Sequence, residues 1–228
     1  MAEISIENEF AKRNPWVTGF VIDGEKYGGD FCAMQDRRLD QFFQCFPDVQ
    51  TILELGSLEG GHTFSLGKHP GVQRVIGMEG RAANVDRARL VQHLLGINNV
   101  EFVTANLEST DLAKFGQFDA VFCVGLLYHL PEPWILVGQI ARVTERLFVW
   151  THYADMRKAD QIVHGYQGRM YQEQGLVDPL SGMSAKSFWP TYDSLMNMLN
   201  DSGFGTLDLI ENDPKHPHGP CITLAAVQ

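Results

Sequence analysis

The chain has little positive charge, few cysteines and no long hydrophobic run. Its 228 residues carry 28 acidic side chains against 18 Lys and Arg, which gives a formal net charge of −10. This balance argues against a large basic surface for nucleic acid, although a local basic patch stays open. The four cysteines are scattered without a C-x-x-C pair, so a disulfide framework is not expected. No apolar run approaches a membrane span, and the acidic N-terminus does not resemble a signal peptide.

A glycine is also missing from the turn that follows the first apolar run. Residues 51–55 lead directly into Gly56 and Gly60, and a strand that ends in a glycine-rich turn before a helix is how α/β folds build a nucleotide pocket. The dinucleotide fingerprint G-x-G-x-x-G would need its middle glycine where Leu58 stands. A nicotinamide dinucleotide therefore fits this turn poorly.

Two acids near the turn favour a different nucleotide. Glu79 ends the second apolar run, where a carboxylate can accept hydrogen bonds from both ribose hydroxyls. Glu54 lies inside the first run, where it would repel a pyrophosphate but favour a cation. S-adenosylmethionine carries adenosine, a sulfonium and an ammonium, and no phosphate. The chemistry of the turn favours this ligand.

Apolar runs alternate with helical patterns along most of the chain. We expect strands at 51–55, 74–79, 100–105, 118–124, 146–152, 206–211 and 221–227. We expect helices at 82–95, 133–142 and 191–202. The alternation predicts an α/β fold with a seven-stranded, doubly wound, Rossmann-like sheet that is mostly parallel. No helix separates the last two strands, so the C-terminal strand should be antiparallel.

Two aromatic-rich segments stand outside the alternation. Residues 1–48 precede the first strand, and residues 153–190 lie between strand five and the last helix. Both are long enough to cover a pocket, and aromatic side chains suit the wall of a small-molecule site. We expect one domain, residues 1–228, with an N-terminal cap (1–48), a cofactor-binding core (50–152), an inserted lid (153–190) and a C-terminal part (191–228).

Four motifs give the chain a family resemblance. They are ILELGSLEGG (52–61), VIGMEG (75–80), EFVTANLES (101–109) and FDAVFCVGLLYHLPEP (118–133). With them the chain resembles the class I S-adenosylmethionine-dependent methyltransferases, of the small-molecule type. The last motif is also similar to that of relatives that modify the wobble uridine of tRNA. The resemblance is specific for fold and cofactor and weak for the substrate.

The resemblance implies roles for individual residues. Those expected to bind S-adenosylmethionine are Glu54, Gly56, Ser57, Gly60, Glu79, Gly80, Arg81, Asn106, Leu107, Val124, Gly125 and Leu126. Within this set, Glu79 would hold the ribose, Asn106 and Leu107 would meet the adenine, and the last three would lie beside the reacting methyl.

Methyl transfer to an oxygen also needs a proton acceptor, and histidine suits that role near neutral pH. His129 directly follows strand four and His152 ends strand five, so both are candidate bases. Tyr128 is expected to orient the substrate or to close over the cofactor. His216 and His218 follow strand six in a proline-containing loop, where solvated side chains are the simpler interpretation. These histidines match no tight ligand spacing, so no metal is expected.

The acceptor is the least determined part of the prediction. Residues expected to contact it are Tyr27, Phe31, Tyr153, Tyr166, Arg169, Trp189 and His218. The leading hypothesis is a cytoplasmic methyltransferase that acts on an oxygen or nitrogen of a small molecule, with nucleic acid and membrane partners not expected. A tRNA-modifying enzyme and a non-catalytic S-adenosylmethionine-binding protein remain as alternatives. The oligomeric state stays open.

Overall fold

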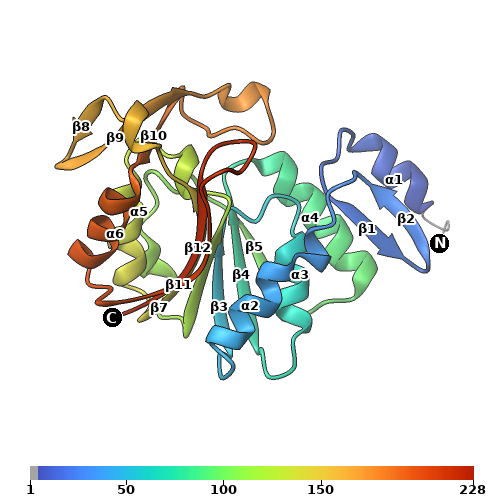
Figure 1. The fold of residues 1–228 in the computed structure, drawn as a ribbon. Coiled ribbons are helices and arrows are strands. Elements are labelled where there is room, and N and C mark those ends of the chain that lie inside the picture. Colours follow the sequence, from blue (N-terminus) through green and yellow to red (C-terminus); the bar gives the residue numbers. More distant parts are fainter. Residues whose placement is uncertain (1–4) are drawn as a thin grey trace.

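A seven-stranded sheet forms the centre of the protein, described here from a computed structural model for residues 5–228 (Figure 1). Its strand order is β11-β12-β7-β6-β3-β4-β5. The strands are β3 (Thr51–Leu55), β4 (Arg74–Glu79), β5 (Val100–Thr104), β6 (Ala120–Val124), β7 (Arg146–His152), β11 (Thr206–Asp213) and β12 (Cys221–Val227). Neighbours among β3 to β7 pair in parallel, whereas β12 runs antiparallel to both β7 and β11. The predicted mostly parallel sheet with an antiparallel last strand is confirmed.

Six helices accompany the sheets in this part of the chain. They are α1 (Ile6–Lys12), α2 (Arg37–Cys45), α3 (Gly61–Lys68), α4 (Ala82–Leu95), α5 (Pro133–Ala141) and α6 (Tyr192–Asp201). Of the strand predictions, 118–124 begins too early. The backbone N–H of Phe118 donates to Val143, and that of Asp119 donates to Thr51, so both residues pair outside the ladder that starts at Ala120. The strand predicted to end at 211 continues to Asp213 because it stays paired with β12 up to Cys221.

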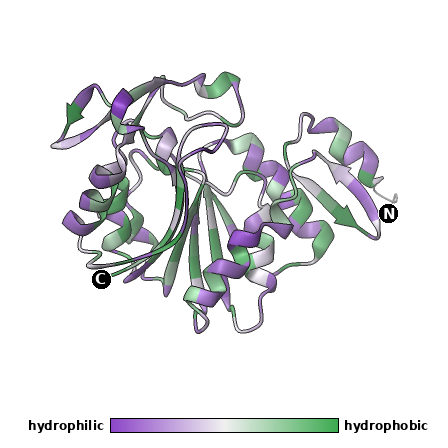
Figure 2. Ribbon diagram, viewed as in Figure 1, coloured by the Kyte–Doolittle hydropathy of each residue, from purple (hydrophilic) through white to green (hydrophobic). Residues whose placement is uncertain are grey.

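Alternating side chains of the central strands build two hydrophobic clusters, one on each face of the sheet. Leu53 and Leu55 belong to the cluster that includes residues of α5 and α6. Ile52 and Phe122 belong to the other, which includes residues of α2, α3 and α4. Figure 2 shows the central strands as predominantly hydrophobic, while the helices carry hydrophilic residues as well. This two-sided burial fixes the strand register and holds the strand ends that carry the site.

The two segments outside the alternation contain regular structure that the sequence analysis did not predict. The N-terminal segment forms α1 and an antiparallel hairpin of β1 (Gly19–Ile22) and β2 (Glu25–Gly28), followed by α2. The inserted segment forms a separate three-stranded sheet of β8 (Gln161–Val163), β9 (Tyr166–Gln172) and β10 (Lys186–Pro190). In Figure 1 this small sheet lies above one edge of the central sheet, and the α1–hairpin unit lies to one side.

Within residues 5–228, no helix combines the length and the apolar composition that a bilayer crossing requires.

Candidate active site

A cavity of about 580 Å³ opens where β3, β4, β5, β6 and β7 end. Its walls come from the glycine turn, the loops after β4, β5 and β6, the inserted segment, the start of α2 and the β11–β12 loop. Among residues predicted to bind the cofactor, it is lined by Gly56, Ser57, Glu79, Gly80, Arg81, Asn106, Leu107, Val124, Gly125 and Leu126. One cavity therefore collects predicted residues from four separate sequence motifs.

The glycine turn folds back on the neighbouring strand. The N–H groups of Gly56 and Ser57 both donate to the carbonyl of Met78, at 2.9 and 3.0 Å. Gly56 has φ +81°, a left-handed conformation that glycine adopts without strain. The Ser57 hydroxyl is buried without a hydrogen-bond partner, which marks it as a group available to a ligand.

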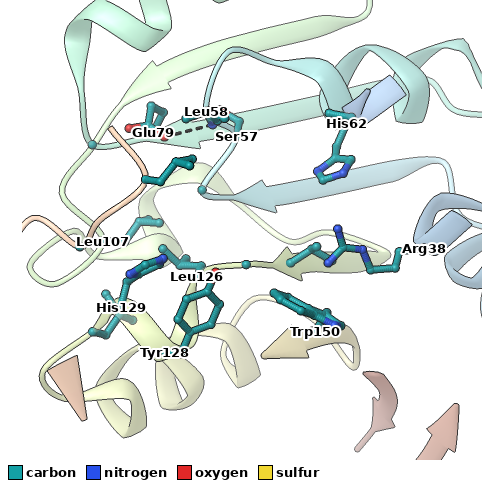
Figure 3. Close-up of a pocket in the computed structure, with 18 of the residues that line it drawn as sticks. Arg38, Ser57, Leu58, His62, Glu79, Leu107, Leu126, Tyr128, His129 and Trp150 are labelled. Atoms are coloured by element: carbon teal, nitrogen blue, oxygen red, sulfur yellow. Dashed lines mark hydrogen bonds between the residues drawn. The ribbon is translucent and has the colours of Figure 1, made fainter. Parts of the chain in front are cut away.

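Glu79 is held as a buried acceptor at the tip of β4. Its carboxylate accepts hydrogen bonds from the N–H of Leu58 (3.0 Å) and the N–H of Arg81 (2.8 Å), and Figure 3 shows the first of these. Burial raises the pKa of Glu79, although the two N–H donors oppose the shift. The carboxylate is thus fixed in direction before any ligand arrives, as a ribose-binding group should be.

Glu54 and Gly60 support the cavity from outside its lining. Glu54 is 1% exposed and accepts a short hydrogen bond from the Thr63 hydroxyl, and its oxygen lies 3.7 Å from His62. Burial raises the pKa of Glu54, opposed by His62 and Thr63. Gly60 caps the N-terminus of α3 with φ +85°. Direct contact between these two residues and the cofactor stays a prediction.

The inserted segment is fastened over the Glu79 end of the cavity by backbone and side-chain contacts. The Arg81 guanidinium donates to the carbonyls of Gly175, Asp178 and Ser181, at 2.8 to 3.0 Å. The Met183 side chain lies against Gly80, where an added Cβ would stand 2.1 Å from its sulfur. The inserted segment therefore supplies part of the wall that encloses the Glu79 end of the cavity.

His129 joins the loop after β6 to the same inserted segment. Its Nδ1 lies 3.2 Å from Oε1 of Glu173, and Oε2 of the same carboxylate accepts from the Gly182 N–H at 2.8 Å. Burial lowers the pKa of His129, and the Glu173 carboxylate opposes this shift. The ring lines the cavity, so a neutral, oriented imidazole faces the ligand space (Figure 3).

The far end of the cavity is built around Arg38, at the start of α2. Its guanidinium lies 4.6 Å above the Trp150 ring and forms an ion pair with Asp36. Asp36 also lies 2.9 Å from His62 Nε2. Burial opposes ionisation of Asp36, but the contacts with His62 and Arg38 outweigh it and hold its pKa below the usual range. Figure 3 shows Arg38 and Trp150 at the opposite end of the site from Glu79.

Tyr128 lines the cavity between these two ends. Its ring centroid is 4.1 Å from that of His129 and 5.8 Å from that of Trp150. Burial raises the pKa of Tyr128 to about 12, so the hydroxyl stays protonated at neutral pH. It can therefore donate or accept a hydrogen bond as a neutral group.

His152, the second predicted base, does not line the cavity. It is 5% exposed and its ring stacks on Trp189 at 4.9 Å, behind Tyr128. His216, which the sequence analysis treated as solvated, does line the cavity, and its ring lies 5.2 Å from that of His152. A route from His152 to the ligand would therefore pass through a neighbouring side chain.

Of the residues predicted to contact the acceptor, Phe31 lines the cavity and the others do not. The hydroxyls of Tyr153 and Tyr166 donate to Asn212 and Asp201, at 2.8 and 2.9 Å, so internal partners hold both side chains. The remaining four are placed elsewhere: Tyr27 packs on Phe10, Arg169 lies over Tyr171, Trp189 stacks on His152, and His218 is exposed. Any contact with an acceptor stays a prediction for these six.

Comparison with known proteins supports a methyltransferase cofactor site in this cavity. The family profile described as "Methyltransferase domain" matches residues 53–146. The N-terminal domain of EvdMO1, crystallised in the presence of SAH and D-fucose, is 34% identical with a TM-score of 0.88, over 97% of this chain and 95% of that domain. The full-length EvdMO1 structure matches with 32% identity and a TM-score of 0.77, and this chain covers 46% of it.

A curated relative is more distant. The tRNA U34 carboxymethyltransferase of Psychromonas ingrahamii is 26% identical over 139 residues, which make up 59% of this chain and 41% of the relative. The chain thus spans less than half the length of that curated protein.

The chain belongs to the class I S-adenosylmethionine-dependent methyltransferases. Its own residues fit that cofactor: a fixed Glu79 carboxylate that can accept hydrogen bonds from ribose hydroxyls, an unpartnered Ser57 hydroxyl and a glycine turn that leaves room for the ligand.

Most of the far end of the cavity could not be predicted from the sequence. Asp36, Arg38 and Trp150 line or border it, together with Glu211, Asp213 and Cys221 of the last two strands. Glu173 and Met183, which complete the enclosed end, were also not singled out. The local sequence offers a structural role for Asp36 alone: its side chain caps α2 by accepting a hydrogen bond from the Arg38 N–H. The others come together only when distant segments meet.

Proposed function

We propose that this methyltransferase moves the methyl group of S-adenosylmethionine to a hydroxyl oxygen of a small, polar acceptor, with a sugar as the favoured class. The observation that carries the proposal is the shape of the cavity. Its 580 Å³ extend from Glu79 to an aromatic and charged far end, under the inserted segment. Ligand sites of about 300–1,000 Å³ suit small molecules. The similar EvdMO1 domain was crystallised in the presence of D-fucose, which supports a sugar.

Two residues at the cofactor end would bind S-adenosylmethionine in different ways. Glu79 would accept hydrogen bonds from the ribose hydroxyls, and the Ser57 hydroxyl would gain the partner it lacks. The cofactor supplies a sulfonium methyl, which an oxygen can displace in line. Since the leaving group is good, much of the rate can come from holding the acceptor in position and excluding water. The inserted segment serves both purposes.

His129 is the residue we assign as proton acceptor. An imidazole that faces a carboxylate through Nδ1 presents Nε2 to the ligand, as in other nucleophile-activating pairs. Its lowered pKa keeps it neutral near pH 7, so Nε2 can take the proton of the acceptor hydroxyl. Glu173 would stabilise the imidazolium that forms, from its distance of 3.2 Å.

The far end supplies groups for a hydroxylated acceptor. The Trp150 face and the Tyr128 ring offer apolar surface, while Arg38 and His216 offer polar atoms at the cavity wall. Acidic side chains also line this end, among them Glu211 and Asp213. Glu211 forms an ion pair with Arg37 at 2.5 Å. Carboxylates hydrogen-bond sugar hydroxyls but repel phosphodiesters, so this end suits a sugar better than RNA.

Modification of tRNA is the second candidate, because of the partial match to the tRNA U34 carboxymethyltransferase. It would require a basic path for the RNA backbone. The net charge of −10 and the acids at the cavity rim count against it.

The decisive experiment measures SAH formation from S-adenosylmethionine with two acceptor panels. One contains 6-deoxyhexoses and their glycosides, each paired with an analogue that lacks one hydroxyl, and the other contains unmodified tRNA. We expect turnover with members of the first panel and loss of turnover when the accepting hydroxyl is removed. Turnover with tRNA alone would replace the proposal by the second candidate. Tight SAH binding without turnover on either panel would favour a binding protein.

A further inference from the structure

Three side chains with metal-binding atoms meet where β7 ends and β12 begins, next to Trp150. Within residues 5–228, His152, His216 and Cys221 place one ligand atom each within 4.8 Å of the other two. His152 ends β7 and Cys221 begins β12, and the two residues are direct partners in the antiparallel ladder. Directly opposed residues share a face of the sheet, which brings these side chains together. His216 reaches them from the β11–β12 loop.

The hydrogen bonds of His152 leave one ring nitrogen free for a ligand. Its Nδ1 lies 3.0 Å from the Gly219 carbonyl and 3.1 Å from the Pro220 carbonyl. Carbonyl oxygens only accept, so Nδ1 carries the proton and Nε2 presents a lone pair. A metal-binding histidine is held in the same way, since its second nitrogen donates to a carbonyl or a carboxylate. The stack on Trp189 fixes the ring further.

The other two side chains connect this cluster with the cavity. Cys221 is 5% exposed and His216 is half-buried, and both line the cavity, whereas His152 lies behind them. Burial raises the pKa of the Cys221 thiol, and a hydrogen bond from Trp150 opposes the shift. His216 Nδ1 accepts a long hydrogen bond of 3.3 Å from the His218 N–H. Coordination through Nε2 would place the ring proton on Nδ1, so this hydrogen bond would be lost.

We propose that His152, His216 and Cys221 form a binding site for a borderline-soft divalent cation of the Zn²⁺ type, with its remaining position open to the far end of the cavity. Two imidazoles and a thiolate are a typical donor set for Zn²⁺. Three protein ligands with one open position distinguish reactive zinc sites from closed structural ones. The inference goes beyond the proposed function, because cation binding needs neither the methyl donor nor the acceptor.

The geometry is close to what a tetrahedral ion needs. Bonds of about 2.0–2.3 Å place ligand atoms roughly 3.3–3.8 Å apart, somewhat less than the 4.8 Å limit that the three atoms satisfy here. His216 is the one member that is not fully buried, so a rotation of its side chain can close the difference. Sequence spacing could not reveal this site, because residues 152, 216 and 221 follow no metal-binding pattern. The β7–β12 pairing joins His152 and Cys221, and the β11–β12 loop brings His216 to them.

A cation in this position would border the far end of the cavity, which the acceptor of the proposed reaction would occupy. A bound Zn²⁺ lowers the pKa of a coordinated oxygen and so favours its ionised form. Binding must also release the thiol proton, so the apparent affinity should rise with pH.

The test uses the full chain, free of any affinity tag, reduced and stripped of metal with a chelator. Titration with Co²⁺ should give one equivalent of binding and a near-ultraviolet thiolate-to-cobalt absorption band. Cys221→Ser should abolish the band, and His216→Ala should weaken Co²⁺ binding by about tenfold or more. The matched control is His218→Ala, which removes a histidine two positions away in the same loop. Competition with Zn²⁺ should displace Co²⁺ from the wild type.

SAH binding and circular dichroism show that each variant is folded, so loss of cation binding can be assigned to the site. Absence of the band in the folded wild type would overturn the proposal. So would a band that survives Cys221→Ser, or equal losses in His216→Ala and His218→Ala. Because the readout is absorption, failure of the sugar-methylation proposal leaves this result unaffected.

Discussion

The two ends of the cavity are built in different ways. The cofactor end is made from short contiguous motifs: the turn after β3, Glu79 at the tip of β4 and the loop after β6. The far end is assembled from Arg38, Trp150 and His216, which lie far apart in the chain. The ligand-facing groups of the first end depend on local backbone geometry, with the inserted segment as an outer wall, whereas the second end depends on how α2, β7 and the β11–β12 loop pack together. A single fold can thus keep the methyl donor constant while the acceptor site changes.

The largest effect on activity should come from substitution of His129, the proposed proton acceptor. His129→Ala should lower kcat by about 10²–10⁴-fold, the usual contribution of a general base. SAH affinity should change little if His129 acts on the acceptor proton. The measurements are steady-state kinetics with an acceptor found in the panel experiment and calorimetry with SAH. Full activity with intact SAH binding would remove His129 from the proton transfer.

Glu79→Ala should disable the cofactor end alone. A hydrogen bond to a charged group contributes about 1.5–3 kcal/mol, so losing the ribose contacts should weaken S-adenosylmethionine binding by roughly two orders of magnitude. Calorimetry measures this directly, and Glu101→Ala, an exposed acid on β5, is the matched control. Unchanged affinity in Glu79→Ala would contradict the assignment of the cofactor end.

The same division explains what the sequence could and could not predict. β3, β4, β7 and β12 have the predicted bounds, because each is an apolar run buried in the central sheet. Glu79 could be singled out because a strand, a turn and an acid follow one another locally. Arg38 could not, because an arginine near a helix start is ordinary until β7 brings Trp150 beneath it. The small sheet of β8 to β10 was missed for a related reason. β8 and most of β9 are half-exposed or exposed, and the apolar residues of the buried β10 are limited to Phe188, Trp189 and Pro190, so these strands lack the apolar runs that marked the central ones.

Glu173 offers a pH test of how the inserted segment contributes. A base must be neutral to act, so activity should rise as the pH passes the pKa of His129. The Glu173 carboxylate raises that pKa against the effect of burial. Glu173→Gln removes the charge, so the pKa of His129 should fall. The rising part of the plot of activity against pH should therefore move to lower pH, with a reduced kcat.

The control for the pH test is Glu132→Gln, which changes an acid near the same loop; within residues 5–228 the side-chain ion pair of His129 is with Glu173 and not with Glu132. If the rising part of the pH–activity plot does not move in Glu173→Gln, the His129–Glu173 pair does not control the proton transfer. An upward shift would contradict the electrostatic role of the carboxylate.

Arg81→Ala should loosen the wall of the cofactor end without touching Glu79. The guanidinium holds three carbonyls of the inserted segment, so its loss should expose residues 174–184 to proteolysis. S-adenosylmethionine affinity should fall by about tenfold, less than in Glu79→Ala, because enclosure is reduced while the ribose acceptor remains. Limited proteolysis with and without SAH measures the first effect, and Arg89→Ala, which breaks a bond to the Phe102 carbonyl, is the control.

Arg38→Ala should give the smallest effect and should fall on the acceptor alone. A hydrogen bond contributes about 0.5–1.5 kcal/mol, so losing the bond that Arg38 would donate to the acceptor should raise the acceptor KM by about twofold to tenfold. SAH affinity should stay the same, since Arg38 lies at the opposite end from Glu79 (Figure 3). Arg74→Ala, an exposed arginine paired with Glu101, controls for the loss of charge. If Arg38→Ala weakens SAH and acceptor equally, the two ends are not independent, and the separation on which the comparison rests fails.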